Sequence, residues 1–415
     1  MPVSLLATLI ATSVTADLLP LDVLTYQFFD PATGALCLDG SIGGYAGRNG
    51  SETQLVLHLP GGGWCETEGG CAARASTGLG STTELLKGGN TTIVQGEMSA
   101  NATLNPHFYT WTHVEPIYCD GSNFAGAQDH PGMPGALYNG TLHVRGRQIL
   151  TSVLDVILDD WGLKHTLEEV ILSGCSAGGL GVYYNADFVH TYVQSKLAHG
   201  KALKMRAFGN AGWFLDLNSP GWDGPAWSST RPRGMLLYAW AGLQQTLNSD
   251  CITTYKATGE TWRCALAQYL YPFVETPTLA LQSSYDLNQL ANSGLKCLQG
   301  AAAGFARLPN GQYGPKSLFP HSFPNCTDVE IREIDVYGDT LKVSLSTARR
   351  GAAFVPTCTI HCYTAFWTQI KIDDVTMADA IYAFYSAANP NGMVWQDTCR
   401  GGNCNPTCPV AVTSE

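Results

Sequence analysis

A serine flanked by small residues is the first feature of this chain that could do chemistry. Residues 174–178 read Gly-Cys-Ser-Ala-Gly, which matches the pattern G-x-S-x-G. An apolar run, residues 169–173, precedes the motif, and a stretch with helical spacing, residues 180–197, follows it. In this pattern a sharp turn from strand to helix exposes a serine oxygen as a nucleophile for acyl transfer. We therefore predict that Ser176 is a nucleophile; the alternative is an inert serine in a glycine-rich turn.

A nucleophilic serine needs backbone N–H donors that stabilise the oxyanion formed on attack. One donor comes from the residue after the serine, here Ala177. Residues 60–63 read Pro-Gly-Gly-Gly and follow an apolar run, the place from which such sites take their second donor. We predict that the donors are Gly62, Gly63 and Trp64 together with Ala177, although a plain tight turn would use the same glycines.

The base of such a site follows the serine in the chain. The histidines after Ser176 are His190, His199, His321 and His361. We prefer His361, because disulfides at Cys358 and Cys362 would hold its loop in place. His190 and His199 lie on or just after the predicted helix, and His321 lies in a proline-rich loop with no strand before it.

The acid is expected between the serine and the histidine. Asp286 comes just after the apolar run of residues 278–282. There it would hold the imidazole in the required tautomer and stabilise the imidazolium. Three other acids are less well placed, namely Asp216, Asp223 and Asp250.

Short apolar runs alternate with stretches of helical spacing along the chain. Strands are expected at residues 55–59, 113–118, 169–173 and 278–282, and helices at 148–158 and 180–197. This alternation is typical of an α/β protein with a mainly parallel sheet and helices on both faces. Ligands of such sheets bind beyond the carboxyl ends of the strands, where the motifs fall. We predict one domain over residues 17–415.

The N-terminus predicts secretion. Residues 1–16 are apolar and end in small residues, with Val14 and Ala16 spaced as in a signal-peptidase site. We therefore predict a signal peptide over residues 1–16 and a mature protein that is extracellular or in the cell wall. The run has no Lys or Arg, so a buried N-terminal strand or helix is the alternative. No later run has the roughly 20 apolar residues of a membrane span.

The cysteines agree with an oxidising compartment. There are 14 of them, and in a secreted protein an even number predicts disulfides. The local pairs expected are Cys65–Cys71 and Cys251–Cys264, while Cys175 could be a packing thiol or a disulfide partner. Five sequons are candidates for glycosylation, at Asn49, Asn90, Asn101, Asn139 and Asn325.

Two classes of binding are not expected. Structural zinc at Cys358, His361 and Cys362 is a competing interpretation, but tight cysteine pairs at zinc-finger spacing are missing, so we predict no metal. The chain has 23 Lys and Arg against 34 Asp and Glu, a formal net charge of −11. Because it also lacks a basic run, nucleic-acid binding is not expected.

Together these motifs resemble the pectin acetylesterase family, which includes the Notum-type carboxylesterases. The shared segments are GGGWC at residues 61–65, YCDGS at 118–122, SGCSAGG at 173–179, YD at 285–286 and C-x-x-HC at 358–362. The resemblance runs from about residue 24 to residue 409. Pro60 departs from it, since the family often has Glu there, and this changes the entry to the oxyanion loop.

The resemblance implies an α/β-hydrolase-like fold with disulfide-braced loops and a Ser-Asp-His esterase without a cofactor. Its triad would be Ser176, Asp286 and His361. The serine turn and the histidine loop are closest to the plant-type members. This implies hydrolysis of acetyl esters on pectin-type cell-wall polysaccharide through an acyl-serine intermediate.

Two other functions stay open. A Notum-like deacylase would remove a fatty acyl group from a secreted protein; it would need a deep apolar cavity, whereas acetate needs a shallow one. An inactive binding protein on the same scaffold would lack a triad residue, and none is missing here. The acidic chain should repel a polyuronate unless basic residues such as Arg349 and Arg350 gather near the cleft.

Overall fold

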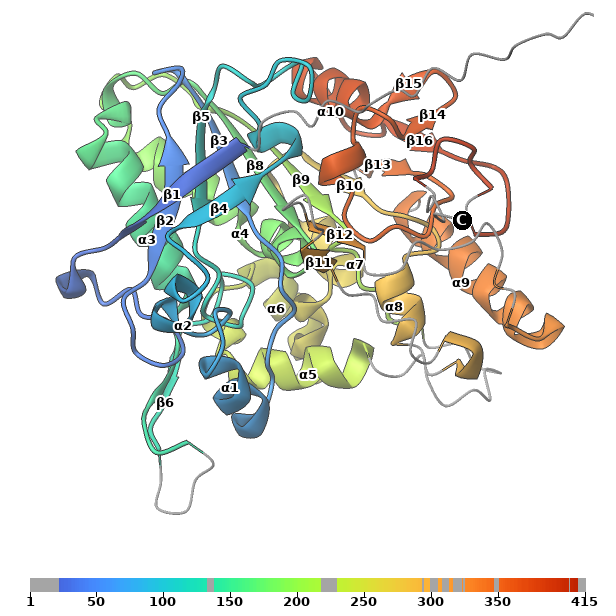
Figure 1. Ribbon diagram of the computed structural model, residues 1–415, viewed down its shortest axis with the longest axis horizontal. Helices are drawn as coiled ribbons and strands as arrows, with labels where there is room; N and C mark the ends of the chain where they lie inside the picture. The colour runs from blue at the N-terminus through green and yellow to red at the C-terminus, as the bar shows by residue number, and fades with distance from the viewer. Residues whose placement is uncertain are drawn as a thin grey trace, which may run out of the picture.

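The structure is a computed structural model of the chain. A ten-stranded sheet forms its centre (Figure 1). The strand order is β16-β13-β10-β9-β8-β3-β5-β2-β1-β4. The structure describes residues 22–132, 138–217, 230–292, 295–298, 305–307, 313–315, 323, 325–346, 351–402 and 404–409.

The strands of this sheet are β1 Asp22–Phe28, β2 Gly44–Arg48, β3 Gln54–Leu59, β4 Thr91–Val94, β5 Thr112–Pro116, β8 Glu169–Cys175, β9 Lys204–Asn210, β10 Thr278–Leu281, β13 Ala352–Val355 and β16 Val394–Gln396. The longer helices are α1 Glu68–Ala75, α3 Gly146–Asp155, α4 Ala177–Lys196, α5 Thr230–Trp240, α6 Ser249–Lys256, α9 Asp328–Ser346 and α10 Met377–Ser386. Shorter helices are α2 Thr82–Leu86, α7 Ala267–Leu270 and α8 Leu287–Ala291.

The sheet is mainly parallel, as the alternation of elements predicts. The run from β5 through β3, β8, β9, β10 and β13 to β16 pairs in parallel. At the other edge, β2, β1 and β4 pair antiparallel. The carboxyl ends of the parallel strands therefore share one edge of the sheet, and loops that leave these strands can meet there.

The predicted strands and helices are all present, with shifted boundaries. The helix expected at residues 180–197 begins earlier, at Ala177, directly after the serine. Glycines at positions 178, 179 and 181 hide this start, because glycine is a poor helix former. The helix expected at residues 148–158 begins at Gly146 and passes at Val156 into a π-helical turn.

Apolar clusters on both faces of the sheet form the core. Side chains alternate across a strand, so Leu55 and Leu57 of β3 join the cluster that contains α3 and α4 residues, whereas Val56 joins the cluster that contains α10 residues. Both faces of the strand are thus covered, which explains why β3 reads as an almost continuous apolar run.

Cysteines join distant segments of this frame. The disulfides are Cys37–Cys119, Cys65–Cys71, Cys175–Cys362, Cys251–Cys264, Cys297–Cys326, Cys358–Cys408 and Cys399–Cys404. The expected pairs Cys65–Cys71 and Cys251–Cys264 are confirmed. The zinc interpretation is wrong for Cys358 and Cys362, because both sulfurs are in disulfides and neither is a thiolate.

The sequon asparagines lie at or near the surface. Asn49, Asn90, Asn139 and Asn325 are exposed, and Asn101 is half-buried. Their glycosylation stays a prediction. The expected signal peptide, residues 1–16, lies outside the described residues. Within the part of the chain that the structure describes, no helix is long and apolar enough to cross a membrane.

Buried His113 on β5 predicts a pH dependence of stability. Burial and the nearby charge of Arg48 lower the pKa of His113 from 6.5 to about 4. Below pH ~6.5 this imidazole is protonated in the unfolded chain, whereas in the folded protein it stays neutral down to pH ~4. The free energy of unfolding should therefore fall by about 3 kcal/mol in total as the pH drops from ~6.5 to ~4. Urea unfolding between these pH values measures the slope.

The substitution His113→Gln removes this titration and should flatten that slope. A variant with the same slope as the wild type would show that His113 is not its source.

Candidate active site

Ser176 occupies the sharp turn between β8 and α4. Its backbone has φ 58° and ψ −120°, a conformation that side-chain-bearing residues adopt only under strain. Close packing explains the glycines around it: a Cβ on Gly178 would lie 1.9 Å from the carbonyl oxygen of Leu59, and one on Gly174 would lie 2.5 Å from that of Gly178. The predicted strand–turn–helix is therefore present, and it presents the serine at the carboxyl edge of the sheet.

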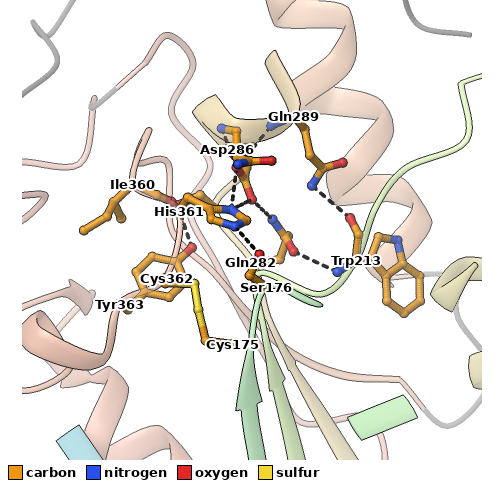
Figure 2. A network of polar contacts seen from close by, with 12 residues as sticks. Cys175, Ser176, Trp213, Gln282, Asp286, Gln289, Ile360, His361, Cys362 and Tyr363 are labelled. Atoms are coloured by element: carbon orange, nitrogen blue, oxygen red, sulfur yellow. Dashed lines mark hydrogen bonds and ion pairs between the residues drawn. A yellow bond between two sulfur atoms is a disulfide. The ribbon is translucent and has the colours of Figure 1, made fainter. Parts of the chain in front are cut away.

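Three predicted residues meet at this edge (Figure 2). Ser176 Oγ lies 2.8 Å from His361 Nε2, and His361 Nδ1 lies 2.9 Å and 2.8 Å from the two carboxylate oxygens of Asp286. A carboxylate only accepts hydrogen bonds, so Nδ1 carries the proton and Nε2 is left to accept from the serine. The side chains come from loops after β8, β10 and β13, which end at the same edge.

Asp286 is held by more than the histidine. It is fully buried and caps α8, accepting hydrogen bonds from the backbone N–H groups of Asn288 at 2.9 Å and Gln289 at 3.4 Å. Gln282 Nε2 donates a third bond to it at 2.7 Å. These donors stabilise the ionised carboxylate and fix its orientation toward His361.

Two glutamines anchor this acid to the neighbouring loop after β9. Gln282 accepts a bond from the backbone N–H of Trp213 at 3.1 Å, and Gln289 accepts one from Leu215 and donates one to the Trp213 carbonyl. Figure 2 shows both side chains between the loops. Sequence reasoning missed Gln282. The signal that could have found it is a polar residue at the end of the apolar run of residues 278–282.

A disulfide joins the serine turn to the histidine loop. Cys175 precedes Ser176, Cys362 follows His361, and the two sulfurs are bonded (Figure 2). This settles the open role of Cys175. On the other side of the histidine, Ser283 Oγ donates to the Ile360 carbonyl at 2.7 Å. The histidine loop is thus fastened on both sides of its imidazole.

The glycine loop lies against the serine turn. A Cβ on Gly61 would lie 2.9 Å from that of Ser176. Gly62 and Gly63 have φ of 143° and 65°, values that favour glycine. The Gly62 carbonyl accepts from Arg74 at 2.9 Å and the Gly63 carbonyl from Tyr118 at 2.6 Å. In a trans peptide the next N–H points the opposite way, so these bonds orient the N–H groups of residues 63 and 64.

The other predicted donor is Ala177, the first residue of α4. Its N–H has no partner within the helix, and the helix dipole places partial positive charge there. The side chain of Trp64 is used elsewhere, since its ring packs edge-on against Phe214 at 5.0 Å. That these N–H groups form the oxyanion hole stays a prediction.

The alternative residues lie away from Ser176 or outside the described residues. Asp216 pairs with Arg231 at 2.9 Å, and His199 Nε2 lies 2.9 Å from the Leu167 carbonyl. Asp250 stands in the first turn of α6, and His190 lies beside Thr276. Asp223 and His321 lie outside the described residues.

Removal of the Cys175–Cys362 bond should destabilise the fold more than removal of a local bond. Its cysteines are 187 residues apart, whereas Cys65 and Cys71 are 6 apart. Loop-closure entropy gives about 5 kcal/mol for the long loop and about 2 kcal/mol for the short one. Paired alanine variants compared by urea unfolding would measure this, and equal losses would contradict it.

Known proteins resemble this chain over most of its length. Pectin acetylesterases 5 and 11 of Arabidopsis thaliana are 28% and 27% identical over 90% and 94% of this chain, and over 82% and 94% of their own lengths. Palmitoleoyl-protein carboxylesterase notum2 of Xenopus laevis is 25% identical, over 90% of this chain and 72% of its own.

A solved structure of the Wnt deacylase Notum from Drosophila has a TM-score of 0.75 at 24% identity, and it covers 94% of this chain and 100% of its own. It shares the fold, which confirms the expected α/β-hydrolase-like architecture. The family model described as pectinacetylesterase matches residues 19–409. Because this match spans nearly the whole sequence, the chain belongs to the pectinacetylesterase family.

Proposed function

We propose that this protein is a secreted serine carboxylesterase that hydrolyses acetyl esters of pectin-type cell-wall polysaccharide. The observation that carries the proposal is the continuous hydrogen-bonded line from Ser176 through His361 to the buried Asp286. The similarity to pectin acetylesterases supports the substrate class. The seven disulfides support an extracellular location, since such bonds persist in oxidising compartments.

The arrangement supports acyl transfer in two steps. His361 Nε2 takes the proton of Ser176 as its Oγ attacks the acetyl carbon, and Asp286 stabilises the imidazolium. The N–H groups of Gly63, Trp64 and Ala177 would stabilise the oxyanion. The imidazolium then gives its proton to the departing sugar oxygen. Water, activated by the same histidine, cleaves the acetyl-serine ester and regenerates the free serine.

The cavity beside Ser176 bears on the fatty-acyl alternative. It has a volume of about 610 Å³, more than the two carbons of an acetyl group need. Volume alone therefore favours a larger group. The lining is mixed: Ile93, Met98 and Ile117 would suit a hydrocarbon, whereas Glu115 and His58 also face the cavity. Hydrocarbon packed against these two ionisable groups would take water away from them at a cost in free energy, and this cost supports the acetylesterase. Arg349 and Arg350, which could supply a basic patch or form a solvated surface pair, lie outside the described residues.

Ser176 should be the residue labelled by a fluorophosphonate probe, because an activated serine attacks phosphorus as it attacks an ester. Ser176→Ala should abolish labelling and lower kcat by several orders of magnitude. His361→Ala should be nearly as damaging, whereas Asp286→Asn should retain more activity, because the triad residues act as a unit. Labelled-peptide mapping and ester hydrolysis measure these effects. Labelling that persists in Ser176→Ala would refute the assignment.

Substrate choice separates the two esterase functions. We expect acetate release from acetylated pectin and a preference for short over long p-nitrophenyl esters, because a long acyl chain would pack against Glu115 and His58. Values of kcat/KM on acetylated pectin, acetylated xylan and the ester series test this. Preference for esters of about eight or more carbons, with no acetate from either polysaccharide, would favour the deacylase instead.

A further inference from the structure

A row of ionisable side chains lies on the sheet beneath the cavity. His58 pairs with Ser173 across β3 and β8. On its other side, Leu57 pairs with Val114 of β5, so the next residues along, His58 and Glu115, point to the same face of the sheet. Both line the cavity that also contains Ser176. The row therefore belongs to the space beside the nucleophile, although the triad does not use it.

His58 directs one edge of its ring to this cavity. The residue is 7% exposed. Its Nδ1 lies 3.0 Å from Glu97 Oε1 and 2.8 Å from Ser173 Oγ. Among the described residues, every hydrogen bond of the ring goes to Nδ1. Burial opposes the charged form, but the bond and charge of Glu97 outweigh it and raise the pKa of His58. Nδ1 carries the proton that Glu97 accepts, so Nε2 accepts a hydrogen bond in the neutral ring and donates one in the charged ring. It has no partner in the described chain.

Glu115 supplies a second polar group on the same cavity wall. Within the described residues its side chain has one hydrogen bond, from the Thr92 hydroxyl at 3.4 Å. Burial raises the pKa of Glu115. A second carboxylate brought beside it would raise this pKa further, because each of two neighbouring carboxylates disfavours the ionised form of the other. Glu115 and the Nε2 of His58 suit hydroxyl groups, which can both donate and accept hydrogen bonds.

The rest of the lining is uncharged or apolar. None of the described residues that line the cavity is Lys or Arg. Arg74 lies near it but donates to the carbonyls of Gly62 and Leu79, and its charge faces the buried Asp120. The walls include Ile93, Met98 and Ile117. A free uronate would find no unpaired cation here, because any charge on His58 is paired with Glu97 at 3.0 Å, whereas the apolar face of an uncharged ring would find a surface.

We propose that this cavity seats an uncharged sugar ring next to the scissile ester, either a methyl-esterified galacturonate or a neutral sugar, and discriminates against a ring with a free carboxylate. Glu115 and the Nε2 of His58 are the groups that bind its hydroxyls. The inference rests on the proposed acetylesterase function. The sugar ring would fill the part of the cavity volume that an acetyl group leaves empty.

The test compares one acetylated, highly methyl-esterified pectin with the same polymer after enzymatic removal of its methyl esters. The readout is the ratio of kcat/KM for acetate release on the two polymers, so partial loss of folded enzyme cancels. In the wild type the esterified polymer should be preferred by about tenfold. At about 1 M NaCl, where surface charges are screened within about 3 Å, the preference should persist.

Glu115→Gln should shrink this ratio because the carboxyl is lost, and Glu115→Lys should reverse it. Glu52→Gln is the matched control: it makes the same charge change at an exposed position and should keep the wild-type ratio. A wild-type ratio of one or less, or an unchanged ratio in Glu115→Lys, would overturn this inference alone. Acetate release from neither polymer would overturn the proposed function and the inference with it.

Discussion

The close approach of the first turn of α4 to the end of β3 is the constraint on which the site depends. Gly178 packs so tightly that any Cβ would collide with the Leu59 carbonyl. This contact places the strained turn at Ser176 directly against the glycine loop that follows β3. One backbone contact therefore sets both the position of the nucleophile and the distance to its predicted oxyanion donors. The strain at Ser176 persists because packing around it allows no other conformation.

The acid and the base reach the serine from loops that the sheet alone does not hold. Backbone hydrogen bonds join the loops after β10 and β13 to each other, from Tyr285 to the Cys358 carbonyl at 3.2 Å and from Leu287 to the Thr359 carbonyl at 3.0 Å. Further covalent and polar links tie both loops to the rest of the site. Cys175–Cys362 ties the histidine loop to the serine turn, and Gln282 ties Asp286 to the loop after β9. Catalysis by hydrogen-bonded side chains requires such rigidity, since small displacements of the reacting atoms lower the rate of reaction steeply.

In the described part of the chain, the ionisable side chains near the Ser176–His361–Asp286 line have hydrogen-bond partners of their own and do not bind to the triad residues. Glu97 holds His58 through Nδ1, and burial raises the pKa of the neighbouring Glu115. These groups are expensive to bury without partners. The position of His58 and Glu115 on the cavity wall allows a bound substrate to serve as their partner, which is the physical reason to regard the wall as a recognition surface rather than as part of the core.

The amino-acid sequence by itself determined the elements and the local turns. The period of the apolar residues predicted β3, β8, β10 and α4, and the small residues around Ser176 predicted the turn, because both depend on contiguous residues. Order along the chain narrowed the acid and the base to a few candidates, and the strand before Asp286 and the cysteines around His361 decided between them. The boundaries were less certain at the glycine-rich start of α4, where local propensity opposes the helix that tertiary packing imposes.

Only the tertiary structure decided which distant residues meet. Three distant contacts leave no pattern in the sequence: the bond of Cys175 to Cys362, the bond of Gln282 to Trp213, and the row formed by His58 and Glu115. Each arises from strand order and register, which set residues more than 50 positions apart side by side. A one-residue change of register would turn His58 to the opposite face. The character of the cavity therefore follows from the pairing of β3 with β5 and β8, not from any single segment.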